Sequence, residues 1–176
     1  MAHAKTFERL CMGQLHETLP RPAGTDPVDH YIQVLADKTG SLIAVSARYG
    51  AMLTNAGART EQIVEEFGEK IGVAFQLADD VIDLMSDSAT PGKTPGTDLR
   101  EGVDTMPVLL LRQALAAGEL DAAGQAILSR LSTGDLGDDE VLAVVVDRLR
   151  SHSVLGRRQQ MVMDWAREAV AVLDGL

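Results

Sequence analysis

The stretch GVAFQLADDVIDLM, residues 72–85, reads as an apolar helix into which Asp79, Asp80 and Asp83 are set. Burying a carboxylate in apolar surroundings costs free energy unless a hydrogen bond or an opposite charge compensates it. On a helix that turns about 100° per residue, Gln76 and the three aspartates fall within one stripe. The pattern therefore predicts a helix that packs on most of its sides, with the stripe lining a cavity or a surface groove. The sides predicted to pack include Phe75, Ile82 and Met85.

The carboxylates of this stripe suit a metal ion. Asp79 and Asp83 are one helical turn apart, and like charges at that spacing repel each other even in water, an effect that a bound cation would reverse. Carboxylate oxygens without a histidine or cysteine nearby favour a hard ion such as Mg²⁺, which keeps several waters and shares the phosphate oxygens of a substrate. The alternative is that the stripe is simply the solvated face of an amphipathic helix.

Two lysines flank the aspartates in sequence. Lys38 lies within the apolar helical stretch ADKTGSLIAVSA, and Lys93 lies in SDSATPGKTPGTDLREG, residues 86–102, which has no apolar period and is predicted to be a loop. A loop of this length is often functional. Each lysine offers a point charge suited to phosphate. The alternative for Lys38 is that its stem packs while its ammonium reaches solvent.

The composition indicates one all-α domain. A chain of 176 residues is the size of a single domain with one substantial core. Hydrophobic residues make up 45% of the chain and aromatic residues 3%, which favours packed helices of Leu, Val, Ile, Ala and Met. Gly and Pro residues separate the chain into segments whose apolar residues do not alternate with period 2, as they would in strands. Asp26 is a predicted N-cap, and Pro27 takes the first helical position after it. The predicted helices are residues 3–18, 27–52, 59–86, 103–117, 119–131, 138–151 and 155–175.

The net charge and the single cysteine limit which binding partners and which cellular compartment the sequence favours. A formal net charge of −10, with the basic residues dispersed along the chain, argues against nucleic acid as a partner. The single cysteine, Cys11, excludes an internal disulfide and is predicted to be a core thiol in a reducing, cytoplasmic setting. No apolar run approaches the length of a membrane span, so we expect a soluble chain.

Competing motifs fail on inspection. The run ATPGKTPG suggests a P-loop, but that motif needs a glycine where this chain has Asp87, and it needs a preceding strand. The spacing of an EF-hand is absent around the aspartates, and the four histidines are scattered without the spacing of zinc ligands. The acidic stripe is therefore the strongest candidate site.

The aspartate segment resembles the second aspartate-rich region of the trans-isoprenyl diphosphate synthases, or polyprenyl synthetases. That family has FQ shortly before DDxxD, then a GKxxGxDLxxG loop, then TxP at the start of the next helix. The upstream DKTGSL resembles the Lys-Thr pair of the family, and MGQLHE resembles its preceding Gly-Gln or Gly-Glu turn. The matching residues are Phe75-Gln76, Asp79-Asp80 with Asp83, Gly92 to Gly102, and Thr105 with Pro107.

The resemblance implies a helical bundle of the isoprenoid synthase type and a prenyltransferase activity. Such an enzyme condenses an allylic diphosphate with isopentenyl diphosphate, assisted by Mg²⁺, into a polyprenyl diphosphate of geranylgeranyl length or longer. The roles implied are metal binding for Asp79 and Asp83 with Asp80 beside them, diphosphate binding for Lys38 and Lys93, positioning of the reacting carbons for Thr39 and Gln76, and packing near the isopentenyl group for Phe75.

The chain also departs from the family. It has no second DDxxD and no GGKRxRP-like basic run, both of which family members carry in an N-terminal half, and it ends where the family usually continues into one more helix. We therefore expect residues 1–176 to be the C-terminal part of a polyprenyl synthetase domain, lacking the N-terminal helices and inactive alone. It would act as a homodimer or with an N-terminal half. The alternative is a non-catalytic helical partner of a complete synthase.

Overall fold

The fold is all-α, as predicted. A computed structural model describes residues 2–85 and 95–176, except for the side chains of Ala2 and Asp83, and every regular element within those ranges is a helix. The chain divides into two compact units, Met1–Leu77 with Met161–Leu176, and Ala78–Gln160. These are called unit 1 and unit 2. The single-domain expectation stays a prediction.

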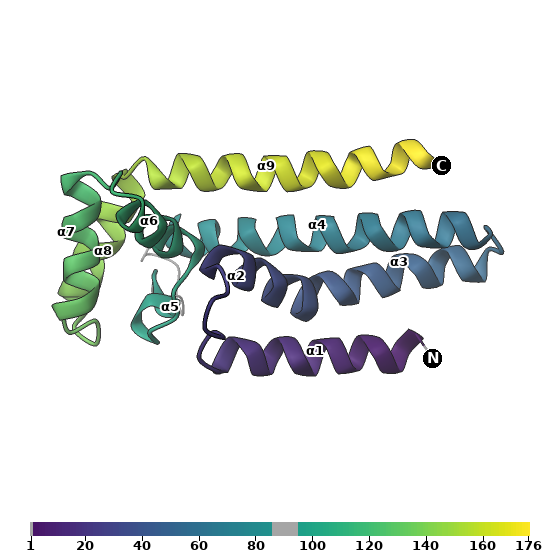
Figure 1. Ribbon diagram of the computed structural model, residues 1–176, viewed down its shortest axis with the longest axis horizontal. Coiled ribbons are helices and arrows are strands. Elements are labelled where there is room, and N and C mark those ends of the chain that lie inside the picture. Colours follow the sequence, from purple (N-terminus) through teal and green to yellow (C-terminus); the bar gives the residue numbers. More distant parts are fainter. Residues whose placement is uncertain (1, 86–94) are drawn as a thin grey trace. The chain divides into compact units, whose positions relative to one another are not determined.

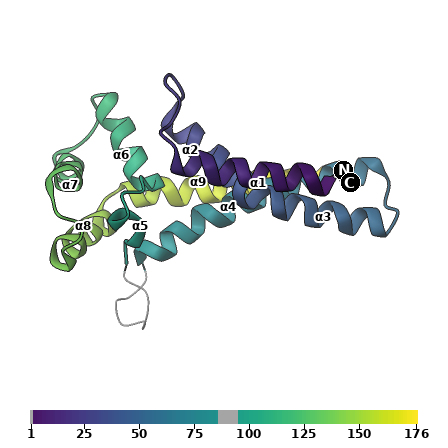
Figure 2. The ribbon, with the colours of Figure 1, turned by 90° about the horizontal axis from the view of Figure 1, so that it is seen from below.

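Unit 1 is built from long helices that run lengthwise beside one another. Figures 1 and 2 show α1, α3, the first part of α4 and the last part of α9 as extended rods within this unit. Helices α4 and α9 continue from one unit into the other. The elements of unit 1 are α1 (Ala2–Thr18), α2 (Pro27–Leu35), the π-helix η1 (Ala36–Gly40), α3 (Ser41–Leu53), α4 (Ala58–Met85), α9 (Val154–Val172) and the 3₁₀-helix η2 (Leu173–Gly175).

The second predicted helix is interrupted by a π-helix. It begins as predicted, because the Asp26 side chain accepts hydrogen bonds from the backbone N–H groups of Val28 and Asp29 at 2.8 and 3.1 Å, with Pro27 in the first turn. Instead of one α-helix over residues 27–52, however, α2 and α3 are joined by η1. Short π-helical turns inside α-helices are rare, and those that occur often lie at functional sites. The residues of η1 are ADKTG, which include Lys38 and Thr39.

Glycines allow η1 to lie very close to its neighbours. A Cβ on Gly72 of α4 would lie 2.7 Å from the Cα of Gly40, and a Cβ on Gly13 of α1 would lie 2.9 Å from the Cβ of Asp37. Both distances are shorter than side-chain atoms tolerate without a shift of the backbone. The π-helix is therefore held between α1 and α4 at distances that only glycine permits.

Within its described residues, unit 2 packs its helices around an aliphatic core. The first six residues of α6 are all buried, and Pro107 lies in its first turn. The predicted loop over residues 86–102 contains a short helix, α5, that the sequence analysis did not predict; residues 86–94 lie outside the described ranges. The elements of unit 2 are α5 (Thr97–Arg100), α6 (Met106–Ala116), α7 (Ala122–Thr133) and α8 (Asp139–Ser151), together with the adjoining ends of α4 and α9.

Two further expectations concern the surface. Cys11 is exposed rather than a core thiol, because the face of α1 that carries it has no covering element within the described residues. Among those residues, no helix is both long enough and apolar enough to cross a membrane.

The start of α7 is fixed by a charged cap. The Asp121 carboxylate accepts a hydrogen bond from the Gly124 backbone N–H at 2.7 Å and lies 2.9 Å from Nε2 of His152. The Val154 backbone N–H donates to Nδ1 of His152, which leaves Nε2 to donate to Asp121. The hydrogen bond from His152, and then the one from Gly124, lower the pKa of Asp121 below its ordinary value of 3.8.

This cap predicts a pH-dependent contribution to stability. Because the pKa of Asp121 is lower in the folded chain than in the unfolded chain, its charge stabilises the fold above pH 3.8 and loses that effect as the pH falls through the folded value. Asp121→Asn keeps a cap but removes the charge. We expect it to lower the free energy of unfolding at pH 7, and the difference from wild type to shrink below about pH 4. Urea unfolding followed by circular dichroism measures this.

The matched control is Asp138→Asn. Asp138 caps α8 through the backbone N–H groups of Glu140 and Val141. A difference between wild type and Asp121→Asn that stays constant from pH 7 to pH 3 would contradict the assignment.

Candidate functional site

Lys38 is held by a carboxylate from α1. Its Nζ lies 2.8 and 2.7 Å from the two carboxylate oxygens of Glu17, and both side chains are about one-third exposed. Glu17 also accepts a hydrogen bond from Nε2 of Gln14 at 2.9 Å. The structure therefore brings together MGQLHE and DKTG, the two upstream motifs of unit 1. The sequence analysis did not single out Glu17.

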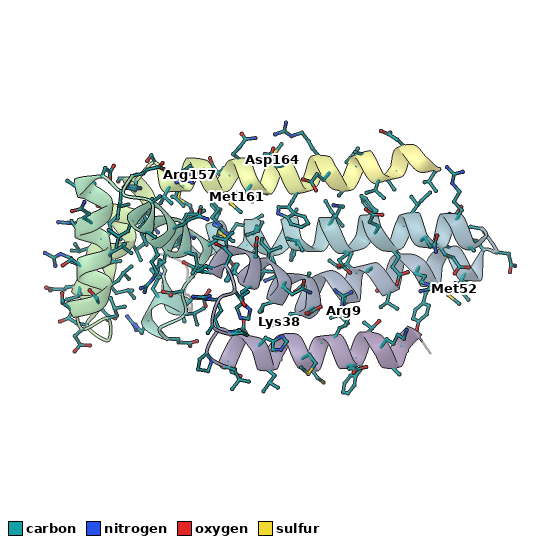
Figure 3. All side chains as sticks on the ribbon, in the orientation of Figure 1. Arg9, Lys38, Met52, Arg157, Met161 and Asp164 are labelled. Carbon is teal, nitrogen blue, oxygen red and sulfur yellow. The ribbon has the colours of Figure 1, made fainter. Side chains whose placement is uncertain are left out.

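An arginine braces the π-helix that carries Lys38 and Thr39. Nε of Arg9 donates to Asp37 at 2.8 Å, and Nη1 donates to Glu69 of α4 at 2.6 Å. The hydrogen bond to Glu69, with a smaller one to Asp37, raises the pKa of Arg9 above its ordinary value, although burial opposes the shift. Figure 3 shows Arg9 and Lys38 between α1 and the helices of the α2–α3 run. Arg9 thus ties α1, η1 and α4 together.

The apolar flank of the aspartate stripe is exposed, which corrects the sequence analysis. Phe75 and Ile82 are 60% and 57% exposed, and Met85 is also exposed, although all three were expected to pack. Phe75 and Ile82 are seven residues apart and so share one face of α4, with Asp79 between them. Gln76 is half-buried. The face of α4 that carries Asp79 is therefore open and largely apolar.

The aspartates of unit 2 lie in two different environments. Asp79 is exposed. The Asp80 side chain is only 10% exposed, and its Oδ2 lies 3.1 Å from Nη2 of Arg158, whose side chain is fully buried. Arg158 is a residue that the sequence analysis missed. It is far away in sequence, and no local pattern marks a buried arginine on an otherwise amphipathic helix.

Several predicted site residues remain untested. The side chain of Asp83 and the whole of Lys93 lie outside the described residues. Within residues 2–85 and 95–176, His, Cys, Asp and Glu side chains form no group of three that is placed to hold a metal ion, and that search does not include Asp83. The predicted metal site is therefore still a prediction. Unit 1 holds Lys38, Thr39, Phe75 and Gln76, and unit 2 holds Asp79 and Asp80.

Comparison with known proteins assigns the family. A family model described as polyprenyl synthetase matches residues 2–135. The chain belongs to the polyprenyl synthetase family. One polyprenyl synthetase relative, the nonaprenyl diphosphate synthase of Mycobacterium tuberculosis, is 38% identical over 168 residues, which are 94% of this chain and 48% of the relative. Heptaprenyl diphosphate synthase component 2 of Geobacillus stearothermophilus is 28% identical over 98% of this chain and 51% of its own length.

A solved structure of the family confirms the fold. The geranylgeranyl pyrophosphate synthase from Corynebacterium glutamicum, complexed with calcium and isoprenyl diphosphate, matches with a TM-score of 0.85 and 38% identity over 99% of this chain and 52% of that one. The predicted isoprenoid synthase bundle is therefore correct. This polyprenyl synthetase chain spans about half the length of the relatives it matches.

Proposed function

We propose that the chain is the part of a prenyltransferase that carries the second aspartate-rich motif, and that it serves the condensation of an allylic diphosphate with isopentenyl diphosphate. The observation that carries this proposal is the open face of α4, where the exposed Asp79 begins the sequence DDVID in a chain whose relatives are named as prenyl diphosphate synthases. Those names support a product of geranylgeranyl length or longer.

A divalent metal ion fits this face. The related structure from Corynebacterium glutamicum contains calcium with isoprenyl diphosphate. The carboxylate of Asp79 is exposed, so its oxygens are accessible as hard ligands. We propose Mg²⁺ as the ion, with Asp79 and Asp83 as its ligands and Asp80 beside them.

The residues of the chain act on the developing charge of the leaving group. As the allylic carbon–oxygen bond breaks, its electron pair leaves with diphosphate, and a metal ion supplies Lewis-acid stabilisation of that charge. Lys38 and Lys93 add positive charge to the same diphosphate. The ammonium group of Lys38 forms an ion pair with the carboxylate of Glu17, so a bound diphosphate would displace that carboxylate from Lys38. Thr39 and Gln76 would line the reacting carbons, and Phe75 would pack near the isopentenyl group.

The chain is proposed to need a partner for turnover. It spans about half of its relatives, and one relative is named as component 2 of a heptaprenyl diphosphate synthase. We propose that it assembles with an N-terminal half, or as a homodimer, in the cytoplasm. The alternative function is that of a non-catalytic helical partner of a complete synthase, which the component 2 relative also favours.

Pyrophosphate binding separates the role of the metal from the role of the lysine. Asp79→Asn should remove the Mg²⁺ dependence of pyrophosphate binding, because it deletes a proposed metal ligand. Lys38→Ala should weaken binding by roughly tenfold or more and leave that dependence intact, because it deletes only a charge-assisted hydrogen bond. Isothermal titration calorimetry with Mg²⁺ and with EDTA measures both.

The controls are two exposed residues of the same types, Lys5 and Asp147. Lys5→Ala and Asp147→Asn should bind pyrophosphate as the wild type does. Identical behaviour of Asp79→Asn and Lys38→Ala would show that the two roles are assigned wrongly.

A further inference from the structure

Arg158 is the most unusual charged residue that the structure describes. Its side chain is fully buried, although it lies on α9, a helix whose neighbouring residues Arg157 and Gln159 are exposed. Arginine is almost never fully buried unless it is paired. One ion-pair partner of Arg158 within the described residues is Asp80, and the two residues lie in the same unit.

Helix geometry explains why Asp80 faces inward and Asp79 does not. Successive residues of an α-helix point about 100° apart. Asp80 shares its face with Leu84, four residues later, and Leu84 is 1% exposed. Asp79 lies on the adjacent, solvent-facing side. While Asp80 is paired with Arg158, Asp79 therefore faces solvent.

A second arginine holds the same end of α4. Nε of Arg150, on α8, donates a hydrogen bond to the backbone carbonyl of Leu84 at 2.5 Å. Leu84 lies in the last turn of α4 that the structure describes. Arginines from α8 and α9 thus both contact the C-terminal part of α4 that the structure describes, which carries the aspartates.

We propose that Arg158 is a positioning residue of the aspartate motif, acting through Asp80, and that Arg150 supports it. In this arrangement Asp80 is an anchor for the helix, and metal binding falls to the exposed Asp79 together with Asp83, the other proposed ligand. If Asp80 turned toward a metal ion, its carboxylate would leave the buried guanidinium of Arg158, and breaking such a buried pair is unfavourable. This inference rests on the proposed function, because it concerns how the proposed metal ligands are held.

The test uses a neutral replacement of the pair in the full 176-residue chain. Arg158→Gln and Asp80→Asn should each weaken Mg²⁺-dependent pyrophosphate binding by about tenfold, as is typical when the residues that orient metal ligands are lost. Binding in EDTA, which depends on Lys38, should not change. The double variant should recover most of the lost binding, because the two amides can hydrogen-bond across the same gap without a buried charge. Calorimetry provides the affinities, and thermal unfolding shows whether each variant is folded.

The matched control is Arg157→Gln, the same change at the adjacent, exposed position (Figure 3). It should leave the Mg²⁺ dependence unchanged. If Arg158→Gln does not fold, Arg150→Gln replaces it in the test, and Arg148→Gln, at an exposed position, is its control. Arg150→Gln should lose Mg²⁺-dependent binding, and Arg148→Gln should keep it.

Three outcomes would decide against the inference or its foundation. A folded Arg158→Gln, or its substitute Arg150→Gln, with wild-type Mg²⁺ dependence would overturn the positioning role. A double variant that binds as weakly as Asp80→Asn would show that Asp80 is itself a metal ligand. A wild-type chain without Mg²⁺-dependent pyrophosphate binding would instead contradict the proposed function, which keeps the two failures distinct.

Discussion

Labelled isopentenyl diphosphate should enter extractable product when the 176-residue chain is combined with an N-terminal half from a relative, and not when the chain is alone. The geranylgeranyl pyrophosphate synthase of Corynebacterium glutamicum, of which this chain covers 52%, is a suitable donor of that half. One carboxylate stripe can hold metal on one side of a diphosphate. Ionisation needs charge stabilisation around a cavity closed to water, and the second substrate needs its own basic pocket.

The surface of α1 supports the same expectation. Phe7, Met12 and Leu15 of α1 are all exposed, as is Leu19 directly after it, although they are large apolar side chains. Exposed apolar groups that gather on one helix mark an interaction site. The lone chain should therefore bind a hydrophobic dye, and the dye signal should fall when the N-terminal half is added.

Two controls make this complementation decisive. The N-terminal half alone, and the mixture containing Asp79→Asn, should incorporate little label. Turnover by a demonstrably pure lone chain would overthrow the proposal that it carries half of an active site. A complex that assembles and folds but stays inactive would favour the non-catalytic partner.

Local chemistry made much of the fold predictable. The end of α1, the start of α4 and both ends of α8 fall within one or two residues of their predicted positions, because proline, glycine and capping aspartates act on the residues next to them. The family could also be identified from the spacing of the motifs around Asp79 and Lys93, since that spacing is a property of the sequence alone.

Contacts between distant residues were not predictable in the same way. The apolar pattern of residues 27–52 is continuous, so nothing in it marks the π-helix at Lys38, which depends on packing against Gly13 and Gly72. The pairing of Asp80 with Arg158 joins residues on two helices that are far apart in sequence. The exposure of Phe75 differs from the prediction because a helical pattern shows which side is apolar, not whether another element covers it.

Two glycine substitutions should change stability in opposite directions. A Cβ added at Gly72 meets the backbone of Gly40 at 2.7 Å, so Gly72→Ala forces α4 away from the π-helix. We expect a loss of about 1–3 kcal/mol in the free energy of unfolding, the usual range for overpacking a close contact. Gly50 of α3 is exposed and has open space where its Cβ would lie. Gly50→Ala should stabilise the chain by about 0.5–1 kcal/mol, because alanine is the better helix former.

The same pair of variants connects packing to the site. Moving α4 away from Gly40 also moves the segment that carries Lys38 and Thr39, so Gly72→Ala should weaken pyrophosphate binding in EDTA, where the lysine dominates. Gly50→Ala lies away from that contact and should bind as the wild type does. Urea unfolding gives the stabilities, and calorimetry gives the affinities. A Gly72→Ala variant that loses stability and keeps its pyrophosphate affinity would show that the contact between Gly72 and Gly40 stabilises the fold but does not position Lys38.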